Sequence, residues 1–235
     1  SMNPTASPLE LGIAQSSASG WLLPLLFIAL AGVAASFAAR APWRNALGAL
    51  TWMALGAQMV IAWQNGASWP VLIYAGEILI VGAASWVCAA GETGKSGPQS
   101  QRMLVLALMC GGIGAALCVE LMDLILWLSV AGAASLGLAI AACGARHSIR
   151  RLIVAEGIAA ALGMLAVLAL APGARLDATL GGPLAQTGFL ILCVYFCVRL
   201  AGALYALRLA ARAGAFTAQL ALGAASVPIM LANFL

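Results

Sequence analysis

Long runs of apolar residues, broken only by short polar stretches, constrain the fold of this chain more than any other feature. A helix that crosses the hydrocarbon core of a bilayer needs about 20 predominantly apolar residues. Only 8% of the 235 residues are charged, whereas a soluble domain carries about 25%. The runs do not alternate between apolar and polar residues, as the strands of a membrane barrel do. The sequence therefore predicts an all-α, polytopic transmembrane helical bundle embedded in a lipid bilayer.

The apolar runs predict about eight transmembrane helices and a division of the chain into two parts. A polar stretch at 92–102 is expected to be a flexible cytoplasmic linker between a three-helix part, 20–91, and a five-helix part, 103–235. Within the second part, only a tight acidic turn at 120–123 separates two of the helices. The expected helices span residues 20–39, 46–63, 69–90, 103–119, 124–145, 152–171, 185–208 and 215–234.

The basic residues sort to one side of these predicted helices. Cytoplasmic loops of membrane proteins are enriched in Lys and Arg. Only Arg175 falls on the opposite side, and Arg199 lies inside a helix. Both chain termini are therefore expected on the non-cytoplasmic side of a membrane, which we interpret as a bacterial inner membrane. The nine residues on the predicted cytoplasmic side are Arg40, Arg44, Lys95, Arg102, Arg146, Arg150, Arg151, Arg208 and Arg212.

The N-terminal segment, residues 1–19, is expected to lie on the non-cytoplasmic side ahead of the first helix. Residues 3–19 contain no Lys or Arg, whereas a secretory signal begins with a positively charged region. The first apolar run is therefore predicted to be retained as a helix. Ser1, which precedes Met2, is interpreted as the remnant of a cleaved tag.

Several classes of function are disfavoured by the residues that could carry them. The basic residues are scattered and form no patch, so nucleic acid is not an expected partner. The chain contains a single histidine, His147, which excludes haem ligation by paired histidines. It also makes a Ser-His-Asp catalytic site a poor interpretation. We expect no metal site and no cofactor. Six cysteines lie in apolar runs and are interpreted as small packing residues: Cys88, Cys110, Cys118, Cys143, Cys193 and Cys197.

Three charged residues fall inside predicted helices: Glu77, Glu156 and Arg199. Charge inside a bilayer is costly, and such residues pair with one another or mark ion pathways. At 1.5 Å per residue, Glu156 lies about 8 Å and Arg199 about 14 Å from the cytoplasmic edge, and Glu77 about 12 Å from the opposite edge. Two interpretations remain open: an ion pair of Arg199 with either glutamate that locks helices together, or a role in ion movement. Glu156 has a third, in which its side chain reaches the cytoplasmic interface.

Residues 36–92 resemble the J-type membrane subunit of respiratory complex I. The similarity is carried by residues 39–47 and by the stretch 71–78, which contains Tyr-Ala-Gly. In that family the third helix has a similar Val-Tyr-Ala-Gly stretch, where a π-bulge forms and couples quinone chemistry to proton movement. The resemblance marks Tyr74 and Gly76 as candidates for a hinge or π-bulge.

Residues 127–212 resemble the K-type subunit of complex I and the small C subunit of Mrp-type cation/proton antiporters. The similarity consists of a helix, a basic turn at 146–151, and a helix with the early glutamate Glu156. Residues 182–186 are similar to the Pro-Leu-Pro-Gln stretch of the antiporter subunit. Arg199 lies near the position of a second buried glutamate in the K-type family. The resemblance implies a fused J–K-like subunit of a complex I-related assembly, a group that includes group 4 hydrogenases.

The favoured function is that of a non-catalytic membrane subunit in a proton- or cation-translocating, complex I-like or Mrp-like assembly. Other membrane subunits would then be its partners, and Glu77, Glu156 and Arg199 would line or gate the ion path. Glu77 departs from the J-type family, which has an apolar residue there. A self-contained small transporter or channel is the alternative. A third possibility is an intramembrane enzyme that acts on lipid, supported only by Glu156.

Overall fold

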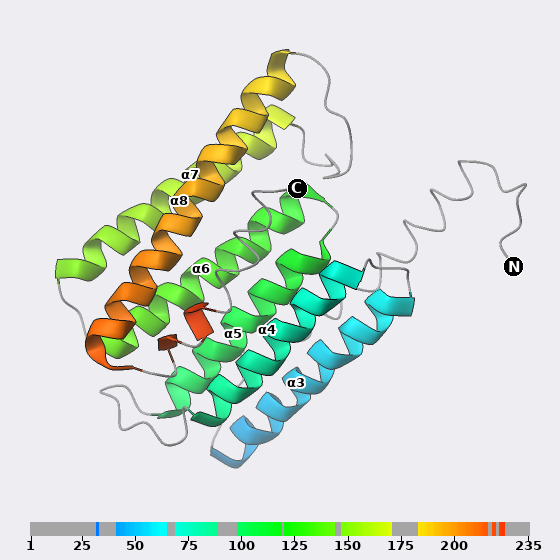
Figure 1. Cartoon of the computed structure of the whole chain (residues 1–235), viewed down its shortest axis with the longest axis vertical. Coiled ribbons are helices and arrows are strands. Elements are labelled where there is room, and N and C mark those ends of the chain that lie inside the picture. The colour runs from blue at the N-terminus through cyan, green and yellow to red at the C-terminus, as the bar shows by residue number, and fades with distance from the viewer. Residues whose placement is uncertain are drawn as a thin grey trace, which may run out of the picture. The chain divides into compact units, whose positions relative to one another are not determined.

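The computed structural model describes residues 41–64, 69–88, 98–118, 120–143, 147–170, 183–215, 218–219 and 221–223, together with Gly32. Six long helices lie within these residues, and each is long and apolar enough to cross a membrane (Figure 1). The length and composition of these helices make the chain an all-α integral membrane protein. The helices are α3 (Ala41–Gln64), α4 (Trp69–Cys88), α5 (Pro98–Leu117), α6 (Leu121–Cys143), α7 (His147–Leu170) and α8 (Pro183–Ala213).

Six of the eight predicted helices correspond to these six helices and are confirmed. The first predicted helix, 20–39, lies outside the described residues apart from Gly32. The eighth, 215–234, is described only at residue 215 and at short helical stretches between 218 and 223. The count of eight helices and the side on which the termini lie therefore stay predictions, as does the division at 92–102.

Apart from α6, four helices extend further into polar sequence than predicted, and one of these, α3, begins at Ala41 instead of 46. Helix α5 begins at Pro98 instead of 103, so the last five residues of the predicted linker are helical. Helix α7 begins at His147, which places most of the predicted basic turn in its first turns, and α8 ends at Ala213 instead of 208. Hydropathy locates only the part of a helix inside the hydrocarbon. Arg and Gln favour helix and proline suits a first turn, so backbone hydrogen bonding continues into the interface.

The acidic turn between α5 and α6 is shorter than the predicted 120–123. Helix α6 begins at Leu121, and the backbone N–H of Leu124 donates to the carbonyl oxygen of Glu120 at 3.1 Å. Asp123 thus lies in the first turn of α6, where a carboxylate favourably faces the positive end of the helix dipole. Acidic residues that resembled a loop therefore belong to a helix start.

The chain divides into two compact units, residues 1–72 and 73–235, with the division inside α4. In the first unit, α3 buries a stripe of residues spaced three to four apart, as on one helix face: Thr51, Leu55, Gln58 and Ala62. The Thr51 hydroxyl donates to the carbonyl oxygen of Leu47 at 2.9 Å, which satisfies a polar group inside an apolar helix. The Gln58 amide has no hydrogen-bond partner among the described residues.

In the second unit, α6 is the central helix. It packs along α5 and contacts both α7 and α8, which themselves pair as an antiparallel hairpin (Figure 1). The membrane-spanning stretches of α5 and α6 are 67% and 61% buried, against 28% and 33% for α7 and α8. The faces of α7 and α8 turned away from α6 are rich in exposed apolar side chains, as lipid-facing surfaces are.

Glycines let α5 and α6 approach closely. A methyl group added at Gly111 would lie 2.6 Å from the backbone nitrogen of Ala131 on α6. One added at Gly114 would collide with the indole ring of Trp127, which is among the largest fully buried side chains. Small residues at such contacts allow the backbone-to-backbone packing by which membrane helices associate. Helix α4 joins this group through Arg102, whose Nε donates to the carbonyl oxygen of Trp86 at 3.2 Å.

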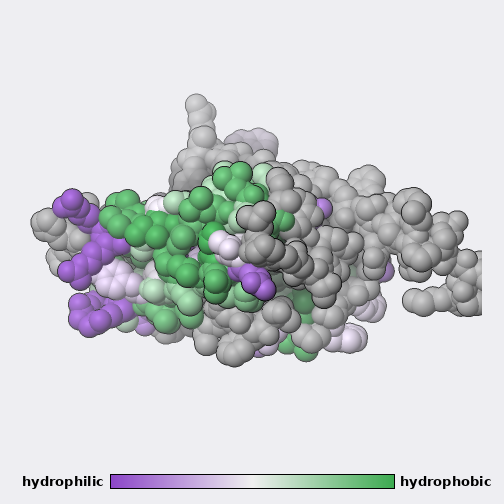
Figure 2. All heavy atoms as spheres, turned by 90° about the horizontal axis from the view of Figure 1, so that it is seen from above, coloured by the Kyte–Doolittle hydropathy of each residue, from purple (hydrophilic) through white to green (hydrophobic). Residues whose placement is uncertain are grey.

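The described basic residues of the second unit gather at one end, apart from Arg199. Arg102 lies near the start of α5, and Arg150 and Arg151 near the start of α7, while Arg208 and Arg212 lie near the end of α8. Since these helices alternate in direction, Figure 1 shows their basic ends together. Figure 2 shows several hydrophilic residues, in purple, at one end of the visible face beside green hydrophobic residues, and another purple patch near the middle. This arrangement agrees with the predicted sorting of charge.

Candidate functional site

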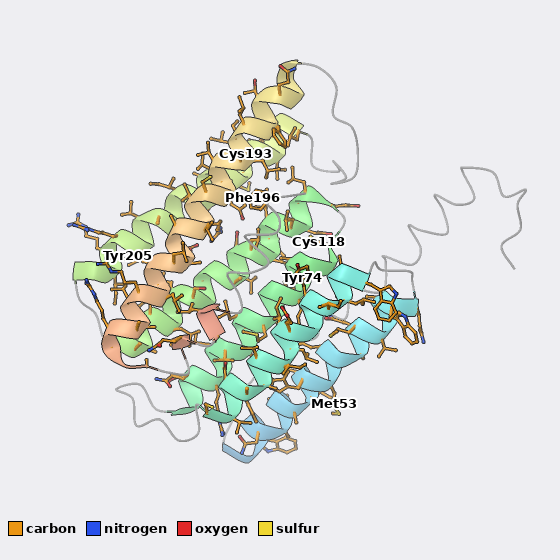
Figure 3. The ribbon with its side chains drawn as sticks, viewed as in Figure 1. Met53, Tyr74, Cys118, Cys193, Phe196 and Tyr205 are labelled. Atoms are coloured by element: carbon orange, nitrogen blue, oxygen red, sulfur yellow. The ribbon has the colours of Figure 1, made fainter. Side chains whose placement is uncertain are left out.

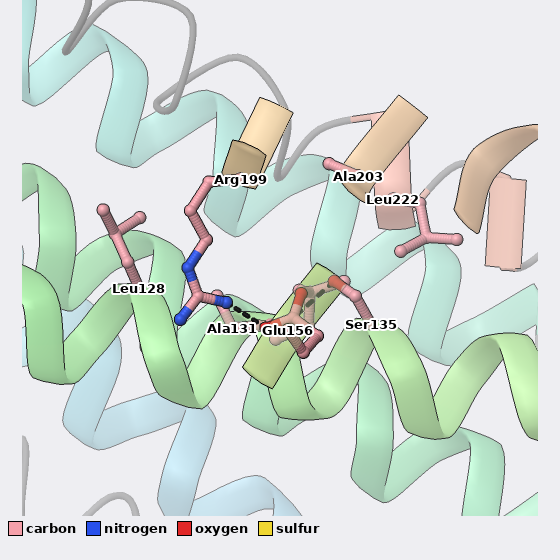
Figure 4. A pocket seen from close by; sticks show the side chains of 9 residues that line it. Leu128, Ala131, Ser135, Glu156, Arg199, Ala203 and Leu222 are labelled. Atoms are coloured by element: carbon pink, nitrogen blue, oxygen red, sulfur yellow. Dashed lines mark hydrogen bonds and ion pairs between the residues drawn. The ribbon is translucent and has the colours of Figure 1, made fainter. Parts of the chain in front are cut away.

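The most unusual feature of the second unit is an ion pair buried between helices. Arg199 on α8 pairs through its terminal nitrogen Nη1 with Oε2 of Glu156 on α7 (Figure 4). The Arg199 side chain is 2% exposed and that of Glu156 is 18% exposed. Both residues lie within membrane-spanning stretches. Of the pairings left open by the sequence, the structure contains the one between Arg199 and Glu156, and the carboxylate turns into the bundle.

Each nitrogen of the Arg199 guanidinium group has a partner. Its Nη2 donates to the Ser129 hydroxyl on α6 at 3.0 Å, and its Nε donates to the Tyr195 hydroxyl at 3.3 Å, one turn earlier on α8. The guanidinium carbon also lies 5.4 Å from the centre of the Tyr195 ring. The Ser129 hydroxyl in turn donates to the carbonyl oxygen of Ile125 at 2.7 Å. Arg199 thus connects α6, α7 and α8, with each of its three nitrogens partnered.

Gly132 on α6 makes the space in which the ion pair forms. A methyl group added at Gly132 would overlap both the Arg199 guanidinium and the Glu156 carboxylate. Gly202 on α8 also faces the pair but at a looser distance, since a methyl group there would lie 3.7 Å from Oε1 of Glu156. The absent side chain at Gly132 is therefore a requirement of the site, whereas Gly202 leaves room for ordinary contact.

A small cavity opens beside the ion pair. It has room for about one water molecule and is polar on one side, where Ser135 lies near the two charged groups (Figure 4). The Ser135 hydroxyl donates to the carbonyl oxygen of Ala131 at 2.8 Å, which leaves its oxygen able to accept a hydrogen bond. The cavity is lined by Leu108, Leu128, Ala131, Gly132, Ser135, Glu156, Arg199, Ala203 and Leu222.

The third predicted charged residue, Glu77, does not join this site. It is exposed on α4, and no described residue forms an ion pair or hydrogen bond with its carboxylate. Tyr74 and Gly76, the hinge or π-bulge candidates, are partly buried and lie in continuous α-helix from Trp69 to Cys88 (Figure 3). The structure therefore brings together two of the three predicted charges, and the hinge stays a prediction.

Three residues of the site were not predicted from the sequence: Ser129, Gly132 and Tyr195. Tyr195 had a usable signal, because a tyrosine four residues before an intramembrane arginine shares its helix face. Ser129 and Gly132 had none, since small residues occur throughout these helices. Their contribution depends on how α6 is rotated against α7 and α8, which spacing along one helix does not reveal.

The cysteines do not form a second polar site among the described residues. Cys88, Cys193 and Cys197 are exposed and Cys110 is buried, and all of these are free thiols. No group of three His, Cys, Asp or Glu side chains within the described ranges is placed to hold a metal ion. Cys118, between α5 and α6, donates to the carbonyl oxygen of Ala115 at 3.1 Å. Burial, reinforced by the nearby Asp123 carboxylate, raises the pKa of the Cys118 thiol to about 12.

The side chains of the cluster differ in how readily they change charge. A guanidinium stays protonated under all physiological conditions, and tyrosine and serine hydroxyls stay neutral near pH 7. Glu156 is the one carboxylic acid among these four side chains.

Comparison with known proteins identifies no relative. No family model, no curated protein and no solved structure matches this chain. The geometry of the Glu156–Arg199 site, together with the membrane-spanning helices, is therefore the basis for assigning a function.

Proposed function

We propose that this chain is an integral membrane subunit of a proton- or cation-translocating assembly of the complex I-related kind, which includes group 4 hydrogenases and Mrp antiporters. One observation carries the proposal: a carboxylate and a guanidinium are buried together within membrane-spanning helices, beside a cavity with room for about one water molecule. Ionisable groups at such depth in membrane proteins mark ion pathways and proton relays.

Stability alone is a weak reason for this ion pair. Removing two charges from water costs several kcal/mol per ion, and their attraction offsets that cost only when the geometry and the remaining hydrogen bonds are favourable. Apolar side chains of similar volume could connect α6, α7 and α8 at least as well. A pair that moves a proton, by contrast, needs both a titratable group and access to water, and Glu156 borders the cavity.

Proton uptake would act on the pair in a simple way. When Glu156 binds a proton, its carboxylate becomes neutral and its attraction for Arg199 falls to that of a hydrogen bond. Arg199 then keeps Ser129 and Tyr195 as partners, and the local net charge rises from zero to plus one. Loss of the proton restores the ion pair. Alternation between these two states would couple protonation to the packing of α6, α7 and α8.

The proposal includes an arrangement in the membrane. Eight helices would span a bacterial inner membrane, with both termini on the non-cytoplasmic side. The grouping of Arg102, Arg150, Arg151, Arg208 and Arg212 at one end of the second unit supports this orientation, because cytoplasmic ends carry the excess of basic residues. Other membrane subunits would cover part of its surface, and Tyr74 and Gly76 would allow α4 to bend.

The test is proton flux through the native assembly reconstituted in liposomes. Glu156→Gln keeps the shape of the side chain but removes the titratable group, so we expect flux to fall about a hundredfold, in the range found for lost proton-transfer groups. The control is Glu120→Gln, because Glu120 is exposed and precedes the membrane-spanning part of α6. This control should leave flux unchanged.

Two other results would contradict the proposal. If Glu156→Gln is incorporated at the normal level and supports full flux, the ion pair only connects helices. If the purified chain alone, as a monomer or homodimer, transports ions at the rate of the native membrane, the chain is a self-contained transporter. Subunit abundance, measured by immunoblot of the same vesicles, separates a loss of flux from a loss of protein.

A further inference from the structure

Helix α4 presents an exposed stripe with a glutamate in it. The Glu77 stripe consists of Ile73, Glu77, Ile80, Ala84 and Val87, which recur every three to four residues and so lie on one helix face. Ile73, Ile80 and Val87 are 57%, 70% and 64% exposed. The opposite face of α4 is buried. The stripe would be ordinary lipid-facing surface if Glu77 were apolar.

The position of Glu77 is incompatible with contact to lipid alone. The membrane-spanning part of α4 runs over Val71–Cys88, so Glu77 lies about 9 Å inside it at 1.5 Å per residue. Ionisable side chains at such depth face protein or water and are paired, because hydrocarbon cannot solvate them. Within the described part of the chain, no hydrogen bond or ion pair reaches the Glu77 carboxylate. The stripe therefore needs a polar partner.

No Lys or Arg among the described residues pairs with Glu77. Of its eleven Lys and Arg residues, Arg199 is the one deep inside a membrane-spanning stretch, and it is engaged by Glu156, Ser129 and Tyr195. Every other Lys or Arg lies within two turns of a helix end or in a polar stretch of the sequence. A second copy of the chain has the same shortage, since its Arg199 is buried in the same way.

We propose that the Glu77 stripe is the docking surface for a transmembrane helix of a different protein, one that carries a Lys or Arg within the membrane. Apolar contacts along Ile73, Ile80 and Val87 would align the two helices, and the ion pair would select the partner, because a helix without a cation leaves Glu77 unpaired. The inference rests on the proposed membership in a larger assembly and names the surface and the chemistry of one partner.

Glu77→Leu tests the surface without endangering the fold. The substitution removes a charge from a membrane-spanning helix, so α4 becomes more apolar and its insertion is favoured. We expect the variant to accumulate at the wild-type level and to lose its partner. If Glu77 has no role in binding, the Glu77→Leu variant should keep all the partners of the wild type. Glu120→Gln serves as the matched loss of a carboxylate outside the membrane.

The decisive experiment is photo-crosslinking in the native membrane. A benzoylphenylalanine at Ile80, one turn from Glu77, would be activated in the full chain, and the crosslinked peptide would be sequenced by mass spectrometry. The same residue at Leu168 on α7, which is 74% exposed, reports the background of lipid contact. We expect the Ile80 crosslink to map to a membrane-spanning segment of another protein that contains Lys or Arg.

Charge exchange then identifies the ion pair. The crosslink should fall about tenfold or more in Glu77→Leu and Glu77→Lys, and it should return when the partner's basic residue is changed to Glu in the Glu77→Lys background. The inference is overturned if the crosslink maps to a second copy, to this chain itself, to lipid alone or to a helix without a cation, or if it persists in Glu77→Leu. None of these results depends on proton flux, so failure of this inference and failure of the proposed function are distinguishable.

Discussion

At the scale of single residues, three charged side chains lie within membrane-spanning helices, where an unpaired charge is energetically costly. They occur in two different arrangements. Glu156 and Arg199 neutralise each other inside one bundle, with Ser129 and Tyr195 completing the hydrogen bonds of the guanidinium. Glu77 lies exposed on α4. We propose internal proton exchange for the first arrangement and recognition of another protein for the second.

Cys118 allows a residue-level test of packing between α5 and α6. Because burial and the Asp123 carboxylate raise the pKa of its thiol to about 12, the reactive thiolate stays rare up to pH 9. We expect maleimide to modify Cys118 in the native protein at least about a hundredfold more slowly than an ordinary cysteine. Cys88, exposed at the last residue of α4, is the comparison. Equal rates at pH 7 to 9 would show that the thiol is not buried, and unfolding in detergent should abolish the difference.

The charged residues inside the helices could be predicted from the sequence, but their pairing could not. Depth can be estimated from the distance along the chain to a helix end, and this estimate placed Glu156 and Arg199 inside the membrane. Which way each side chain points depends on how its helix is rotated against its neighbours. This rotation is hard to predict when nearly all the residues of the helix are apolar. The separation of Glu77 from Arg199 therefore became visible only in three dimensions.

At the scale of helices, the apolar runs predicted the positions of the helices well but their first and last residues poorly. Six predicted helices are confirmed, because an uninterrupted run of about 20 apolar residues has few other stable conformations in a bilayer. Their ends were wrong wherever polar residues continue the helix beyond the hydrocarbon, as at Pro98, His147 and Ala213. Hydropathy indicates where the hydrocarbon ends, whereas the end of a helix is determined by its backbone hydrogen bonds.

Two glycines that face the ion pair provide a matched test of helix packing. Gly132→Ala introduces a methyl group that overlaps Arg199 and Glu156, so α6 must shift or the pair must break. We expect it to destabilise the protein by about 1–3 kcal/mol, the usual cost of overpacking. Gly202→Ala adds the same group at 3.7 Å from Oε1 of Glu156 and should be tolerated.

Thermal unfolding in detergent would measure the difference between these two variants. Both replace a glycine within a membrane helix by the better helix former, so the intrinsic helix propensity changes alike. A lower midpoint for Gly132→Ala than for Gly202→Ala confirms that α6 closes on the ion pair. Equal midpoints would mean that α6 is not in close contact with it.

At the scale of the whole molecule, the long apolar runs and the low charge content were enough to predict an all-α membrane protein. These features could not predict the assembly of the helices into a group centred on α6, because pairing is decided by close contacts such as that of Gly111 with the backbone of Ala131. The proposed function rests on that group, since it encloses the one buried ion pair that the described residues contain.

The most direct measurement compares protein abundance with proton flux for the double substitution Glu156→Leu with Arg199→Met. Replacing both partners leaves no unpaired charge, so the bundle should fold and assemble about as well as the wild type. If the ion pair serves proton translocation, abundance is normal and flux through the reconstituted assembly falls about a hundredfold. Normal abundance with normal flux would contradict the proposal and show that Glu156 and Arg199 only hold α7 and α8 together.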